Sequence, residues 1–124
     1  MQDEPTPVEL IKAVADFLRH EIAPEISGHH AFKLRVSINA LDLVTRQLTL
    51  EQASDSAEAA RLSELLSLQG SLGDLNRALA GRIARGEADL QTPGLAEHLW
   101  QTTMDKLAVD QPNYASYKRE LGSN

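Results

Sequence analysis

Three arginines in the second half of the chain are candidate anion ligands. Arg77, Arg82 and Arg85 fall on one predicted helix, where Arg82 and Arg85 are near neighbours. Guanidinium groups bind phosphate and carboxylate oxygens through paired hydrogen bonds. This basic face is therefore a candidate site for an anion such as a nucleotide-like phosphate, and a solvated surface is its structural alternative.

A polar seam on the predicted central helix is a second candidate, this time for binding a partner protein. Its members are Arg35, Asn39, Asp42 and Arg46, which lie within about 60° of one another at helical spacing. The rest of this helix is largely apolar, so the seam stands out from its surroundings. A local Arg–Asp network on a solvated face is the structural alternative.

Two tyrosines near the C-terminus are further candidates for protein contacts. Tyr114 and Tyr117 lie in a tail with little core-forming pattern. Amphipathic aromatic rings are frequent anchors at protein interfaces. The alternative is that the tail packs on its own domain.

The sequence contains no motif for independent catalysis. His29 and His30 are adjacent, so on a helix their side chains point about 100° apart, which is poor geometry for one metal ion. The Gly70–Gly73 segment lacks the lysine and hydroxyl of a phosphate-binding loop, and no nucleophile or zinc-protease motif is present. We therefore expect no catalytic, cofactor-binding or metal-binding residues, no cofactor, and no enzymatic activity of the chain alone.

Composition favours a helical cytoplasmic protein. The chain has 124 residues, a net charge of −6, 42% hydrophobic and 4% aromatic residues, and no cysteine. Few aromatic residues suit packed helices better than a β-sandwich, and the negative charge argues against nucleic acid or anionic membranes as partners. The N-terminus lacks the apolar region of a signal peptide, and no apolar run approaches a membrane span.

Start and stop signals divide the chain into five predicted helices. Thr6, Pro7 and Glu9 form a capping-box start, and Gly86 is a predicted left-handed cap. The helices are expected from Pro7 to a break at Ser27-Gly28, from about His29 to Leu50, from about Ser54 to Gln69, from about Leu72 to Arg85, and from about Pro93 to Val109.

Hydrophobic spacing assigns faces to these helices. The stretch from Phe32 to Leu50 is apolar on more than one side, so we expect it to be buried among the others. The residues predicted to face inward in the last two helices are Leu72, Leu75, Leu79 and Ile83, then Leu95, Leu99, Thr103 and Leu107, widened by Trp100 and Met104. The predicted fold is all-α, a single compact bundle of about five helices spanning residues 1–124, with an N-terminal arm (1–6), a helical core (7–111) and an irregular C-terminal tail (112–124).

Three stretches of the chain together resemble a family of small bacterial proteins of unknown function. They are Met1-Gln2-Asp3-x-Pro5-Thr6, Phe32-x-x-Arg35-Val36-x-x-Asn39-x-Leu41, and Lys106-Leu107-Ala108-Val109-Asp110-x-Pro112-x-Tyr114-Ala115. Ser37 and Ile38 depart from the alanine-rich residues expected there. The resemblance implies a gene beside an aminoglycoside-phosphotransferase-like kinase and acyl-CoA-dehydrogenase-like enzymes.

The function implied by this resemblance is that of an accessory subunit. The family looks like the small subunit of a kinase that phosphorylates 4-hydroxyacyl-CoA in bacterial levulinate catabolism, with the ATP and Mg²⁺ sites in the large partner. The expected role is to stabilise or activate that kinase without catalysing a reaction. A stand-alone acyl-CoA or anion-binding module and a homodimeric scaffold are the alternatives.

Overall fold

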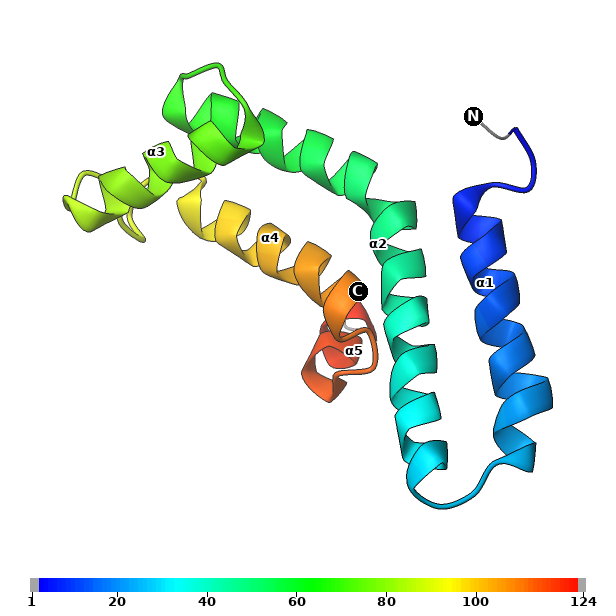
Figure 1. Cartoon of the computed structure of the whole chain (residues 1–124). Coiled ribbons are helices and arrows are strands. Elements are labelled where there is room, and N and C mark those ends of the chain that lie inside the picture. Colours follow the sequence, from blue (N-terminus) through cyan, green and yellow to red (C-terminus); the bar gives the residue numbers. More distant parts are fainter. Residues whose placement is uncertain (1–2, 123–124) are drawn as a thin grey trace. The chain divides into compact units, whose positions relative to one another are not determined.

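The computed structural model describes residues 3–122, and Figure 1 shows the course of the chain. Its α-helices are α1 (Pro7–Phe17), α2 (His29–Leu66), α3 (Leu72–Ala84), α4 (Leu95–Asp110) and α5 (Ala115–Gly122). A π-helix (Leu18–Ile22) and a 3-10 turn (Ala23–Glu25) follow α1. The described residues form no strand, which confirms the all-α class. No helix among them combines the length and apolar character needed to span a membrane.

The fold divides into two compact units, the first ending at Leu50 and the second beginning at Glu51. Helix α2 contributes residues 29–50 to the first unit and 51–66 to the second. The organisation as one domain stays a prediction. Met1 and Gln2 of the predicted arm, and Ser123 and Asn124 of the predicted tail, lie outside the described residues.

The first unit is an antiparallel helix pair (Figure 1). The predicted capping box starts α1: the Thr6 side chain accepts from the Glu9 amide, and the Glu9 carboxylate accepts from the Thr6 amide at 2.7 Å. Pro24 has no N–H for a helical hydrogen bond. Consistent with this, the helix widens to π and tightens to 3-10 around it before the chain turns at Gly28, where φ is +74°.

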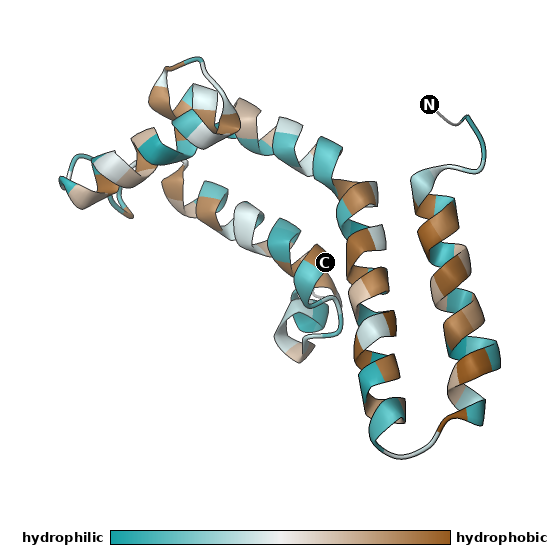
Figure 2. Cartoon of the chain, viewed as in Figure 1, coloured by the Kyte–Doolittle hydropathy of each residue, from teal (hydrophilic) through white to brown (hydrophobic). Residues whose placement is uncertain are grey.

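The predicted break between the second and third helices is wrong, because α2 is continuous from His29 to Leu66. The residues at the expected break, 51–54, include neither glycine nor proline, and glutamate, glutamine and alanine are good helix formers. The hydrophobic pattern loosens there, as the paler and more hydrophilic second half of α2 in Figure 2 shows. That loosening reflects a change in which faces are covered, rather than an end of the helix.

Helix α2 ends in a Schellman-type turn at Ser67. Ser67 adopts a left-handed conformation with φ of +53°, and the Leu68 amide donates to the Ser63 carbonyl at 3.3 Å. The Arg82 guanidinium on α3 also donates to the Leu66 carbonyl at 3.0 Å. The last carbonyls of α2 are therefore satisfied by its own turn and by the neighbouring helix.

Replacing Ser67 with glycine should stabilise the protein by about 0.5–1 kcal/mol. A left-handed residue with a Cβ costs about 1–2 kcal/mol, and the extra freedom of glycine in the unfolded chain offsets about 0.4–1 kcal/mol of the gain. Urea unfolding should show the increase for Ser67→Gly and a decrease for Gln69→Gly, the control. A Ser67→Gly variant no more stable than the wild type would contradict this interpretation of the turn.

The core of the second unit consists of leucines from α2, α3 and the start of α4. Leu62, Leu75 and Leu95 are its most completely buried side chains. The remaining members of the cluster are Leu66, Leu79 and Ala88, with Ala59, Leu65, Leu72 and Ala78 packed at its margin. Ser71 caps α3 by accepting from the Asp74 amide at 3.1 Å, and Gly86 follows α3 at φ of +74°, as predicted.

Helix α4 differs from its prediction in start and in orientation. It begins at Leu95 rather than Pro93, because Thr92 accepts from the Asp89 amide in the preceding loop, and the capping residue is Gly94 at φ of +86°. The predicted inward stripe is wrong at Leu99, Trp100 and Thr103, whereas Met104 and Leu107 are half-buried. Leu99 and Trp100 are exposed, while His98 is buried. Ile83 on α3 is likewise exposed, against the prediction.

The C-terminal tail is not irregular, because residues 115–122 form α5. Helix α4 ends at Asp110, before Pro112, as predicted. The following residues are mostly helix-compatible, and Tyr117 is buried to about nine-tenths of its surface. A single buried aromatic ring is a weak pattern in sequence, which is why the tail showed little core-forming pattern.

Candidate functional site

The predicted polar seam lies on the first unit and is partly engaged within the protein. Arg19 of α1 pairs with Asp16 at 3.1 Å and with Asp42 of α2 at 2.5 Å. Arg35 and Asn39 are exposed, and Arg46 is half-buried. The seam thus contains a local Arg–Asp network, with Arg35 and Asn39 as its outward-facing members. Its role in partner binding stays a prediction.

An apolar face lies on the same helix pair, and we define it as Leu10, Val14, Phe17, Val44 and Leu48. These side chains are 43%, 49%, 50%, 40% and 46% exposed. The spacings 10–14–17 and 44–48 are those of residues that share one side of a helix. The prediction that the central helix is buried on several sides is therefore wrong, since Val44, Leu48 and also Val36 and Phe32 are exposed.

The Arg19–Asp42 bridge fixes how this face is assembled. In an antiparallel pair that places 19 beside 42, Phe17 falls beside Val44 and Val14 close to Leu48. On each helix, the members of the apolar face lie about 120–180° around the helix axis from the residue that forms the bridge, which is Arg19 on α1 and Asp42 on α2, at 100° per residue. The first unit is therefore two-sided, with the polar seam on one side and the apolar face on the other. Figure 2 shows brown bands along both helices of this unit.

The three candidate anion-binding arginines all have partners within the second unit. Arg77 pairs with Asp74 at 2.7 Å. Arg85 donates two hydrogen bonds to the Glu87 carboxylate, at 2.8 and 3.2 Å. Arg82 donates to the Leu66 carbonyl at the end of α2. The hydrogen bond and charge of Glu87 raise the pKa of Arg85, and Arg85 in turn lowers the pKa of Glu87. Anion binding here stays a prediction, and it would have to compete with these contacts.

The two candidate tyrosines have different environments. Tyr114 is exposed between α4 and α5, whereas Tyr117 is buried on α5. The interpretation that the tail packs on its own domain applies to Tyr117. Tyr114 keeps its surface free for a partner.

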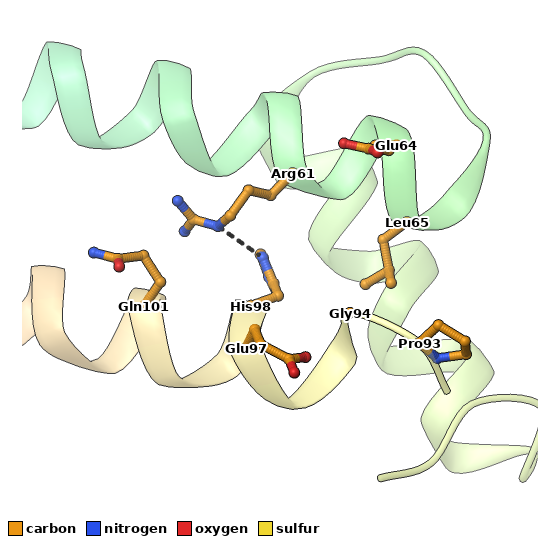
Figure 3. Close-up of a pocket in the computed structure, with 8 residues that line it drawn as sticks. All are labelled: Arg61, Glu64, Leu65, Pro93, Gly94, Glu97, His98 and Gln101. Carbon is orange, nitrogen blue, oxygen red and sulfur yellow. Dashed lines mark hydrogen bonds between the residues drawn. The ribbon is translucent and has the colours of Figure 1, made fainter. Parts of the chain in front are cut away.

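A cavity of about 530 Å³ lies between the second half of α2 and α4 (Figure 3). Its lining consists of Arg61, Glu64, Leu65, Pro93, Gly94, Glu97, His98 and Gln101. Arg61 and His98 come from facing helices and point toward each other, and the Arg61 Nε–H donates to His98 Nδ1 at 3.3 Å. Arg61 also donates to Thr102 Oγ1 at 3.3 Å and lies 3.8 Å from Asp105.

The electrostatics of this cavity keep His98 neutral. Burial lowers the pKa of His98 first, the positive charge of Arg61 lowers it further, and Glu58 opposes both. An Nδ1 that accepts a hydrogen bond leaves the ring proton on Nε2. The cavity therefore offers a neutral N–H donor and the Gln101 amide, with Glu64 and Glu97 at its edge. Among the described residues, no group of three histidine, cysteine, aspartate or glutamate side chains is placed to hold a metal ion.

The stability of the protein should fall as the pH drops below about 6.5, the ordinary pKa of histidine. His98 has a lower pKa in the folded state, so in that range the unfolded chain binds more protons and is favoured. Above that pH this group contributes no slope, because it is neutral in both states. Urea unfolding at several pH values should show a smaller acid loss for His98→Gln and an unchanged loss for the exposed control His30→Gln. Equal slopes in wild type and His98→Gln would contradict this assignment.

Comparison with known protein families matches residues 24–114 to DUF6285, a domain of unknown function. The chain belongs to the DUF6285 family. The DUF6285 match contains all of α2, α3 and α4, and with them the whole lining of the Arg61–His98 cavity. Helices α1 and α5 lie outside the matched residues. No curated protein and no solved structure matches the chain.

Sequence reasoning missed the Arg61–His98 pair in this DUF6285 protein. The two residues are far apart in the chain, and each alone resembles a surface residue. One signal was available: His98, Thr102 and Asp105 recur at spacings of four and three and so form a polar stripe on α4. That stripe faces Arg61, whereas the more apolar stripe through Leu99 was predicted to face inward.

Proposed function

We propose that this chain is a noncatalytic accessory subunit that stabilises or activates an aminoglycoside-phosphotransferase-like kinase acting on a hydroxyacyl-CoA. The kinase identity rests on the family resemblance of the sequence. The observation that supports a binding role is the apolar face of the first unit, whose five side chains are each 40–50% exposed. An apolar patch of this kind is typical of a protein interaction site.

The energetics of the apolar face favour a large partner. Full burial of a valine, leucine or phenylalanine contributes about 1.5–3 kcal/mol, so covering the exposed remainder of five contributes roughly 4–7 kcal/mol. Association costs about 4–15 kcal/mol in lost translational and rotational freedom. The apolar face is thus an anchor that needs surrounding contacts, which a folded protein supplies better than a short peptide does.

The two sides of the first unit make different partner contacts. Asp42 of the polar seam is already paired with Arg19. The groups of the seam that are available to a partner are therefore mainly Arg35 and Asn39. The side chains of the apolar face are not paired in this way within the first unit. We therefore place the main contact on the apolar face and treat the polar seam and Tyr114 as secondary candidates.

A homodimer is the second candidate function, because the same apolar face can pack against its copy. Size-exclusion chromatography with light scattering distinguishes the two. The chain co-expressed with the kinase should elute as a complex of defined stoichiometry, and the chain alone should remain a monomer. A stable dimer of the chain alone that excludes the kinase would overturn the proposal in favour of the scaffold.

A further inference from the structure

A second cavity, of about 330 Å³, lies between α4 and α5 and has a different character from the first. Its lining consists of Trp100, Gln101, Met104, Asp105, Ala108, Tyr117, Glu120 and Leu121. The set combines two aromatic rings with two carboxylates and contains no cationic side chain. The volume is at the lower end of ligand pockets, which suits one side chain rather than a nucleotide cofactor.

The aromatic groups of this cavity are available to a ligand. Trp100 is 55% exposed, although it is the largest side chain in the protein. Tyr117 is buried to about nine-tenths of its surface, and no hydrogen bond from its hydroxyl to another described residue is present. Since no fully enclosed polar atom among the described side chains lacks a partner, the hydroxyl is not fully enclosed, and Tyr117 is one of the residues that line the cavity.

The carboxylates of this cavity are unequal. Asp105 accepts from the Gln101 amide at 2.8 Å and lies 3.8 Å from Arg61, so its carboxylate is already partly engaged within the protein. Glu120 is exposed and forms no ion pair with another described residue. The chain as a whole carries a net charge of −6. A positive group entering the cavity would therefore meet one free carboxylate and one partly engaged carboxylate.

We infer that the α4–α5 cavity receives an arginine side chain of a partner protein. A guanidinium stacks on the indole face of Trp100 and pairs with Glu120, and it donates to the Tyr117 hydroxyl. Arginine fits better than lysine because its planar guanidinium can stack on an aromatic ring and, at the same time, form two hydrogen bonds to a carboxylate. The inference rests on the proposed function for the partner's identity, but the recognition chemistry stands on the cavity alone.

The single tryptophan of the chain makes this site directly observable. The probe is N-acetyl-arginine amide, titrated into the full chain while Trp100 fluorescence is recorded. We expect saturable quenching, with binding of the neutral isostere N-acetyl-citrulline amide weaker by about 10-fold. Glu120→Gln should weaken arginine binding by about 3- to 10-fold, and Glu97→Gln, which removes an exposed carboxylate from the other cavity, should not.

Three outcomes would overturn the inference. They are no saturable change of Trp100 fluorescence, equal binding of the citrulline and arginine probes, and equal or tighter binding of N-acetyl-lysine amide or spermidine. The last would show a general cation site rather than an arginine receptor. None of these outcomes involves the kinase, so failure of this inference and failure of the proposed function are distinguishable.

Discussion

Replacing Leu62 with alanine should lower the free energy of unfolding by about 2–5 kcal/mol. Leu62 is 0% exposed and sits in the leucine cluster shared by α2, α3 and the start of α4. Truncation removes buried methyl groups and leaves a cavity that the neighbouring helices cannot close. The measurement is urea unfolding followed by circular dichroism.

The control for Leu62 is the same substitution at Leu90, which is 73% exposed. Leu90→Ala should change stability by less than about 0.5 kcal/mol. A loss below about 1 kcal/mol for Leu62→Ala would show that this cluster is not the core of the second unit.

Replacing Arg61 with methionine should cost about 1–3 kcal/mol, because it leaves the buried His98 and the half-buried Thr102 without their donor. The His98 Nδ1 atom loses its hydrogen bond, and Thr102 and Asp105 lose a cationic neighbour. Methionine keeps the apolar part of the arginine side chain, so the loss of stability measures the contribution of the guanidinium contacts. Nuclear magnetic resonance titration should also show a higher pKa for His98, since the charge of Arg61 is one of the causes that lower it.

The control for Arg61 is Arg77→Met, which removes an exposed ion pair with Asp74. Such pairs contribute less than about 1 kcal/mol, so the stability of this variant should stay near that of the wild type. If Arg61→Met unfolded like the wild type and left the pKa of His98 unchanged, the Arg61–His98 contact would have no energetic role.

Local signals in the sequence predicted helix ends better than helix faces. The Thr6–Glu9 capping box and the left-handed Gly86 were confirmed, because both depend on residues within one turn. The continuity of α2 was missed because weak periodicity resembles a break, although no residue in 51–54 opposes a helix. The tail helix α5 was missed because one buried tyrosine carries its packing.

The candidate site was harder to predict, because its parts meet only in three dimensions. Helix α4 presents His98 to α2 instead of Leu99, since Arg61 supplies a partner for a polar stripe that would otherwise be costly to bury. The apolar face of the first unit was visible as hydrophobic spacing, but spacing cannot distinguish a covered face from an open one. Exposure of Val14 and Val44 in the folded chain makes that distinction.

The most direct test of the accessory-subunit proposal is the affinity of this chain for the proposed partner, an aminoglycoside-phosphotransferase-like kinase, measured by calorimetry with three forms of the chain. The double variant Val14→Ser/Val44→Ser should bind about 10- to 100-fold more weakly than the wild type, because it makes two positions of the apolar face polar. Arg35→Ala, on the opposite side of the same helix pair, should change the affinity by less than about 3-fold. Wild-type affinity in the double variant, or no binding by the wild-type chain, would contradict the account.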